Sequence, residues 1–225
     1  LNILIDYNKT RNYISTTNTL TRLKEISRRP KDALSAINTY DIAFIQDCLT
    51  SVDDEIVAYA YWTIGQIGIV NPDSVAALIN QAFSDLQSAS EKMRENALFA
   101  IGRTGRAKID IVANRIDEIL SLHTDTVPRV RMSMIWACEN IANTDAELFK
   151  NHIGIFEKLL DDPDEKYVRP EAHEIFRVIG KYKPEIVARS LAKLKEKLND
   201  TCKTMRIHSA GAIRVIEKNL AIEST

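Results

Sequence analysis

One short helical phrase returns five times in this 225-residue chain at an almost constant interval. It opens with an apolar residue followed in four copies by an arginine, and small or apolar residues come after it at helical spacing. Counted at the arginine position, the steps are 37, 37, 38 and 37 residues, from Val57 through Arg94, Arg131 and Arg169 to Arg206. A period of this size over most of a chain is typical of stacked helical repeats. We therefore predict an all-α fold, an α-α superhelix.

Each repeat divides into two helices around an acidic turn. The segments before the turns carry apolar residues at helical spacing, and the second helix begins at the repeated apolar-arginine pair. The expected first helices cover residues 72–86, 109–123, 146–160 and 184–198. The acids of the turns are Asp53 and Asp54, Asp125, Asp162 and Asp164, and Asp200.

This pattern predicts one solenoid domain over residues 1–225 with about five helix pairs. The repeats are expected over residues 35–69, 72–105, 109–143, 145–182 and 184–220, after a partial N-terminal unit over 1–34. The partial unit is indicated by Leu20, Leu23 and Ile26, which repeat the spacing of a second helix. Its first helix would come from residues 1 to about 13. A local break is expected at 28–31, Arg-Arg-Pro-Lys, because the residue before a proline avoids the helical region.

The phrase resembles the HEAT repeat, in particular the short bacterial and archaeal form in which an Asp turn precedes Val-Arg-x-x-Ala-x-x-Ala-Leu-Gly. Residues 93–102, Met-Arg-Glu-Asn-Ala-Leu-Phe-Ala-Ile-Gly, carry the match best. The first full unit departs from it with Val57 in place of Arg, and the third has Cys138-Glu139 at the apolar-Gly end. The resemblance implies a helical solenoid whose second helices line a concave surface, and it leaves the activity open.

The arginines at the repeated position are interpreted as structural. In HEAT-like arrays this arginine resembles an internal strut that reaches Asp side chains or turn carbonyls of adjacent units, and a bidentate guanidinium suits that role. The alternative is a stripe of ligand-binding arginines. The structural ladder comprises Arg94, Arg131, Arg169 and Arg206.

Aromatic residues recur five positions beyond the arginine position in three successive units. They are Trp62, Phe99 and Trp136, and exposed rings here would form a ladder across the N-terminal half of the groove. The alternative is that the rings pack between neighbouring second helices, since large aromatic side chains are mostly buried. If they are exposed, they are the principal binding candidates.

Basic residues mark the other half of the same surface. The candidates are Arg106, Arg177, Lys181, Arg214 and Lys218, with Glu139 as an acidic member of the surface. The competing interpretation is a solvated face, because Glu174 and Glu217 lie nearby. An aromatic half and a basic half together suit an extended or helical peptide with acidic residues at one end.

Composition narrows the classes of partner. The chain has 30 Lys and Arg against 31 Asp and Glu, so no net charge attracts it to nucleic acid or an anionic membrane. No run reaches the roughly 18 apolar residues of a membrane span, and we expect no membrane partner. The three cysteines, Cys48, Cys138 and Cys202, show no close pairing, as in a cytoplasmic protein. The oligomeric state stays open.

Catalytic and cofactor motifs are not found in the sequence. The four histidines never form a metal-binding pair of standard spacing. The HEAT-type deoxyhypusine hydroxylases bind iron with several His-Glu dyads, but His173-Glu174 is a single dyad and cannot fill a coordination sphere. The glycines at 65, 68, 102 and 105 are interpreted as helix C-caps rather than phosphate loops. We expect no catalytic residue, metal or cofactor.

The predicted function is therefore a non-catalytic scaffold that binds a protein or peptide on the concave surface. The alternative is a HEAT-like alkylpurine DNA glycosylase, because Trp62, Trp136, Glu139, Arg103 and Arg106 supply the residue types that such enzymes use. This chain lacks the concentrated positive charge that duplex binding demands, so nucleic acid is the less favoured partner. A bilin-lyase-like HEAT protein is a further alternative that no residue singles out.

Overall fold

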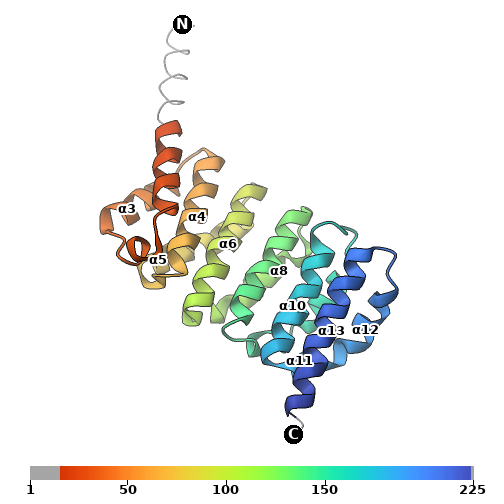
Figure 1. Cartoon of the computed structure of the whole chain (residues 1–225). Helices are drawn as coiled ribbons and strands as arrows, with labels where there is room; N and C mark the ends of the chain where they lie inside the picture. The colour runs from red at the N-terminus through yellow and green to blue at the C-terminus, as the bar shows by residue number, and fades with distance from the viewer. Residues whose placement is uncertain (1–15, 224–225) are drawn as a thin grey trace, which may run out of the picture. The chain divides into compact units, whose positions relative to one another are not determined.

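The computed structural model describes residues 16–223, and all regular structure in this range is helical (Figure 1). The helix expected over residues 1–13 lies outside the described residues. None of the helices in the described range has the length and apolar character needed to cross a membrane. The chain divides into two compact units, Leu1–Ala100 and Ile101–Thr225, and the boundary falls inside helix α6 (Glu91–Ala107).

The first unit is built from helix pairs that share one core. Its helices are one over residues 16–27, then α2 (Lys31–Ser35), α3 (Thr39–Cys48), α4 (Asp54–Gly68), α5 (Pro72–Ser84) and the start of α6. Helix α4 packs against both α3 and α5. Its Tyr61 is fully buried, and the phenol donates a hydrogen bond of 2.5 Å to Asp85 Oδ2 just beyond α5. Helix α4 therefore buries its apolar face against both of its neighbours.

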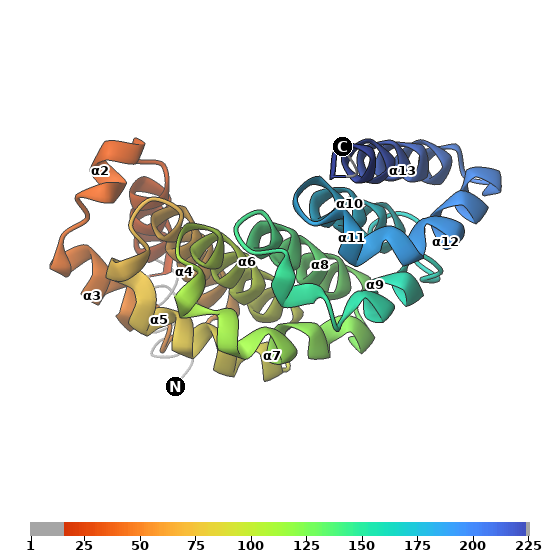
Figure 2. The same cartoon turned by 90° about the horizontal axis from the view of Figure 1, so that it is seen from below.

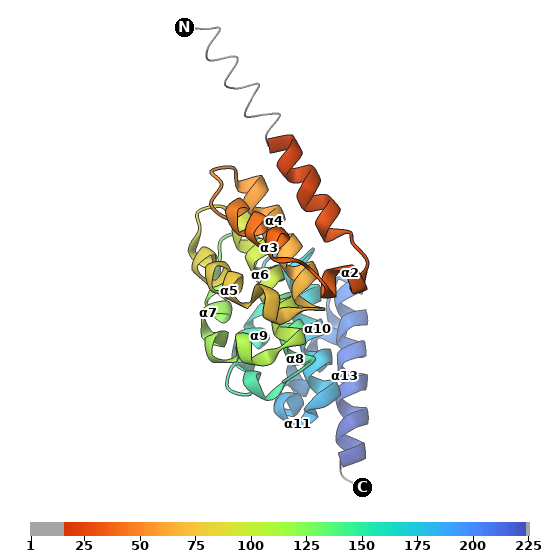
Figure 3. The same ribbon diagram turned by 90° about the vertical axis from the view of Figure 1, so that its left-hand side faces the viewer.

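The helix over residues 16–27 behaves as the second helix of a preceding, partial unit. Leu23 and Ile26 are fully buried, and Thr63 of α4 places its hydroxyl 3.5 Å from the Leu23 carbonyl. The helix ends before Pro30, and α2 starts at Lys31 after a short break, as the basic Pro-containing segment predicts (Figure 3). The apolar spacing of this segment is thus explained by burial against α4.

In the second unit the helices form two layers (Figure 2). The second helices of the repeats, α8 (Pro128–Ala142), α10 (Val168–Tyr182) and α13 (Lys203–Glu223), lie side by side, with α10 between the other two. The first-helix layer contains α7 (Ile116–Leu120), α9 (Ile153–Leu159), α11 (Pro184–Val187) and α12 (Leu191–Glu196). Side chains such as Phe156 and Phe176 fill the space between the layers.

The first helices of the later repeats are not the continuous helices that the sequence predicts. Helix α5 is continuous, but the segments over 109–123, 146–160 and 184–198 alternate short α-helices with 3-10 turns, such as Ile109–Ile111 and Ala113–Arg115. Val112 (φ −126°, ψ −17°) and Val187 (φ −105°, ψ 0°) leave the α region at the joints. β-branched residues lose side-chain freedom in a helix, and packing decides their conformation instead.

Glycines inside the second helices serve close packing, so their interpretation as C-caps is wrong. Gly65, Gly102 and Gly105 lie within α4 or α6, and no described glycine has a positive φ. A β-carbon added at Gly102 would sit 2.7 Å from the Ala137 Cα atom of α8. Neighbouring second helices therefore approach so closely that only a hydrogen fits between them.

We predict that Gly102→Ala lowers the free energy of unfolding by about 1–3 kcal/mol, because overpacking outweighs the gain in helix propensity. Gly211→Ala is the matched control, since nothing lies within 4 Å of a β-carbon at that position in α13. The control should instead stabilise the protein by about 0.5–1 kcal/mol. Urea unfolding of both variants measures the difference, and equal effects would refute the packing role of Gly102.

Candidate functional site

Arg131, the arginine at the repeated position of the third full repeat, is buried. Arg131 places Nε 2.8 Å from Asp162 Oδ2 and Nη2 2.7 Å from Asp162 Oδ1, a bidentate pair with both side chains buried. Its Nη1 donates to the Asp125 carbonyl at 2.7 Å. Asp162 Oδ1 also accepts the backbone N–H of Asp164 at 2.9 Å. Arg131 thus joins its own turn to the turn of the next repeat.

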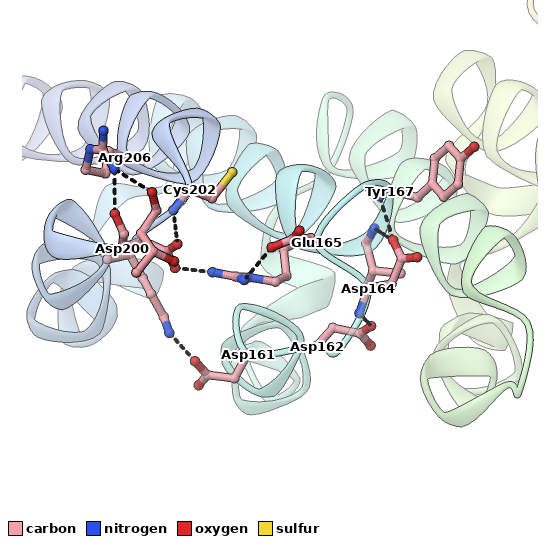
Figure 4. Close-up of polar contacts among 12 residues, drawn as sticks. Asp161, Asp162, Asp164, Glu165, Tyr167, Asp200, Cys202 and Arg206 are labelled. Carbon is pink, nitrogen blue, oxygen red and sulfur yellow. Dashed lines mark hydrogen bonds and ion pairs between the residues drawn. The ribbon is translucent and has the colours of Figure 1, made fainter.

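The other members of the ladder make related contacts. Arg169 forms an ion pair with Asp200, and Arg206 donates to the Asp200 carbonyl at 2.6 Å (Figure 4). In the first unit, Arg94 donates to the Ser88 carbonyl at 2.7 Å. These guanidinium groups face turn carbonyls and carboxylates of the chain itself, so they are engaged in the structure of the array.

We predict that Arg131→Met destabilises the protein by about 3–5 kcal/mol, because it leaves the carboxylate of Asp162 buried and unpaired. Arg206→Met should cost about 1–2 kcal/mol, since Arg206 mainly donates to backbone carbonyls. Thermal unfolding of the two variants compares these costs. Adding Asp162→Asn to Arg131→Met should recover part of the loss, and strictly additive effects would contradict the pairing.

Two of the predicted aromatic residues meet in the first unit. The rings of Trp62 on α4 and Phe99 on α6 stack with centroids 4.2 Å apart and planes 15° from parallel. Trp62 is 38% exposed, whereas Phe99 is partly covered. A β-carbon at Gly65 would lie 2.6 Å from the Phe99 ring, so this glycine makes room for the ring. Phe99 therefore packs between helices and supports an indole that faces solvent.

The third predicted aromatic, Trp136, belongs to the second unit. It lies on α8 and is half-buried. The predicted basic residues Arg106, Arg177, Lys181, Arg214 and Lys218 are exposed. Arg177 is engaged within its own helix, because its Nε lies 2.5 Å from Glu174 Oε2. Positive charge on α10 is thus partly balanced.

The second helices of this unit also bring three carboxyl groups together. Glu139 comes from α8, Glu171 and Glu174 come from α10, and His208 of α13 lies at the edge with Nδ1 2.9 Å from Glu174 Oε1. We call Glu139, Glu171 and Glu174 the carboxyl cluster. Only Glu139 is singled out by the sequence as a surface candidate. The sequence does contain a signal for the others: Glu171 and His208 occupy the same position in consecutive repeats, two residues after Arg169 and Arg206.

Burial and mutual repulsion shift the proton affinity of the cluster. Burial, with the nearby charges of Glu171 and Glu174, holds the pKa of Glu139 well above its usual range, although Arg177 opposes this. Burial and Glu174 raise the pKa of Glu171 to about 7. Burial also acts on Glu174, but hydrogen bonds from His208 and Arg177 outweigh it and lower that pKa. Glu174 is therefore the anion of the cluster at neutral pH, and the other two retain proton affinity.

The His173-Glu174 dyad does not form a joint site. His173 is fully buried, with Nδ1 2.6 Å from the Arg169 carbonyl, and burial lowers its pKa. Glu174 instead contacts His208 and Arg177 at the surface. Within residues 16–223, no group of three or more His, Cys, Asp or Glu side chains is arranged to hold a metal ion.

We predict that the cluster makes the protein less stable as the pH rises from about 5 to 8. The folded pKa of Glu171 lies above its unfolded value near 4.5, so the folded state binds the extra proton in this window and loses that advantage as the pH passes 7. Glu171→Gln should raise the free energy of unfolding at pH 8 by about 1–3 kcal/mol and change it little at pH 5.

Urea unfolding of wild type and variant at both pH values measures this effect. The lowered pKa of buried His173 acts in the opposite sense, but it is common to both proteins and cancels in the difference. Glu196→Gln, at an exposed position of α12, is the matched control and should leave the pH profile unchanged. Parallel profiles for wild type and Glu171→Gln would contradict the shift.

The arrangement of helices is similar to that of several repeat proteins of known structure. A designed armadillo repeat protein in complex with the peptide (KR)4 is 21% identical and has a TM-score of 0.69, over 88% of this chain and 91% of that one. Kap121p bound to Nup53p is 17% identical with a TM-score of 0.61, over 88% of this chain and 20% of that one. Raptor of Chaetomium thermophilum is 16% identical with a TM-score of 0.55, over 89% of this chain and 21% of that one.

This chain has the fold of HEAT and armadillo repeat proteins. The predicted all-α solenoid and the predicted likeness to HEAT repeats are therefore confirmed at the level of the fold. No protein-family model and no curated protein sequence matches the chain. Since a fold of this kind serves many partners, its function has to be argued from the surface of the second helices.

Proposed function

We propose that this protein is a non-catalytic scaffold that binds a peptide or an extended protein segment on the surface of its second helices. The observation that carries the proposal is the exposed indole of Trp62, held on the ring of Phe99. Two of the similar structures are complexes with a peptide or a protein, which supports a partner of this class.

The stacked pair has the properties of a binding anchor. Trp62 leaves more than a third of its surface in solvent, an unusual exposure for a large aromatic residue. Stacking on Phe99 restricts the indole before any partner arrives, so binding loses little side-chain entropy. Exposed, pre-organised tryptophans dominate the binding energy of many interfaces.

Two of the three thiols, those of Cys48 and Cys138, are unsuited to nucleophilic catalysis. Cys48 and Cys138 are buried, and burial raises the pKa of Cys48 to about 11 and that of Cys138 well above its usual range. A thiol with a raised pKa holds little of the reactive thiolate. Free thiols persist in reducing compartments, so we propose the cytoplasm as the site of action.

We predict that Trp62→Ala weakens binding of a peptide ligand by at least tenfold, since hot-spot tryptophans contribute about 2 kcal/mol or more. Ligands are first selected with the wild-type protein from a phage-displayed library of random short peptides and then titrated by calorimetry. Tyr40→Ala is the matched control, because Tyr40 is an exposed aromatic residue on the first helix α3. Equal affinity of wild type and Trp62→Ala for every selected peptide would contradict the proposal.

We predict that duplex DNA does not bind, even at low salt. The chain has a formal net charge of −1, and Arg177 is paired with Glu174. Binding of duplex DNA is driven by phosphate contacts and weakens steeply with salt. A fluorescence titration with a labelled duplex at low and physiological ionic strength tests this. Tight, salt-sensitive binding would favour a DNA-repair function instead.

A further inference from the structure

We propose that the carboxyl cluster of the second unit is a subsite for one lysine or arginine side chain of a bound peptide. This inference rests on the proposed function and adds the chemistry of the partner. The subsite is formed by Glu139 from α8 and by Glu171 and Glu174 from α10. Trp136 stands on α8 one turn before Glu139.

The first observation is an unsatisfied acceptor. The Oε1 atom of Glu139 is closed off from solvent and accepts no hydrogen bond from any residue in the described range. The carboxyl groups of Glu171 and Glu174 lie near Glu139, and the nearby Arg177 donates to Glu174 instead. Buried carboxylate oxygens in proteins are nearly always hydrogen-bonded. A donor from a ligand would complete the set.

The second observation is the distribution of charge. The two basic side chains beside the cluster, Arg177 and His208, both hydrogen-bond to Glu174. Among the described residues, neither Glu139 nor Glu171 forms an ion pair or a hydrogen bond through its carboxylate. Two carboxyl groups are therefore left without a bonded cation. An ammonium or guanidinium group supplies charge and N–H donors in one side chain.

The aromatic neighbour fits the stem of such a side chain. Trp136 and Glu139 are three residues apart on α8, so they share one face of the helix. Trp136 is half-buried. Lysine and arginine lay their apolar stems on such rings and place the charged end beyond them, where cation–π attraction adds to the contact.

The protonation of the cluster gives the proposal a distinctive signature. Burial raises the pKa of Glu139 and Glu171 in the free protein, and a bound cation lowers both again. Binding should therefore release protons near neutral pH and become tighter from pH 6 to pH 8. The titratable and charged groups near Glu139 and Glu171 are Glu174 and Arg177 on α10 and His208 on α13.

The test titrates the full chain with the peptide (KR)4 by calorimetry, beside an uncharged Gln-Ser peptide and an acidic Glu-Asp peptide of the same length. We expect binding of (KR)4 alone, with proton release that is visible as a difference between two buffers of unlike ionisation enthalpy. The Glu139→Gln/Glu171→Gln double variant should bind (KR)4 at least tenfold more weakly at pH 8 and release no protons. Its fold is checked by circular dichroism.

The matched control is the Glu185→Gln/Glu196→Gln double variant. Both positions are exposed and lie in the first-helix layer of the same unit, on α11 and α12, so this variant also replaces two glutamates and leaves the cluster intact. It should bind (KR)4 as the wild type does. An equal loss of affinity in both double variants would mean general attraction to an acidic surface, and it would overturn the subsite.

Three further outcomes are decisive. If magnesium or calcium alone binds stoichiometrically at the cluster and competes with (KR)4, the site is a metal site and the proposal is wrong. If library-selected peptides depend on Trp62 but bind the Glu139→Gln/Glu171→Gln variant unchanged, the subsite fails while the peptide-binding function stands. Loss of all peptide binding in both Trp62→Ala and the cluster variant supports both proposals.

Discussion

The stacking of repeats in the second unit depends on arginine-carboxylate pairs that link one repeat to the next. Arg131 pairs with Asp162 and Arg169 with Asp200, and each pair spans 31 residues of sequence. The receiving carboxylate also accepts the backbone N–H two residues ahead, so one aspartate orders its own turn and holds the arginine of its neighbour. A helix pair has no complete core by itself. These ion pairs fix the position of each turn relative to the next. The apolar faces of neighbouring helix pairs are then buried against each other.

Constant register decides which surface residues become neighbours. Glu139 stands eight residues after its arginine, and it lies beside Glu171 and Glu174, which stand two and five residues after theirs. In the same way, His208 of the next repeat lies beside Glu174. Small residues allow the close helix spacing, as at Gly180, where a β-carbon would clash with the side chain of Ile216. Surface chemistry in this protein therefore arises between repeats, from residues more than thirty positions apart.

Features that depend on local spacing could be predicted from the sequence, whereas features that depend on contacts between repeats could not. The period, the burial of Leu23 and Ile26 and the break before Pro30 follow from local spacing, and the structure has them. The joints at Val112 and Val187 were missed, because apolar periodicity does not distinguish one helix from several short ones that bury the same side chains. Gly102 was misjudged because its role depends on Ala137 in the next repeat. The carboxyl cluster was missed in part for the same reason, since it forms only when the repeats are stacked.

Two buried carboxyl groups of the second unit differ in their hydrogen bonding, and this difference distinguishes a structural residue from a candidate binding residue. Asp162 receives two N–H groups from Arg131 and one from the backbone, so its buried charge is satisfied. Glu139 keeps a buried oxygen without a donor among the described residues, beside two further carboxyl groups. Burial without a partner costs stability, and the array does not require it. At the position that Glu139 occupies in its repeat, the next two repeats carry Arg177 and Arg214, so the register accepts the opposite charge there. An acid retained where the fold accepts a base has its explanation outside the fold, in a cation that the surface receives.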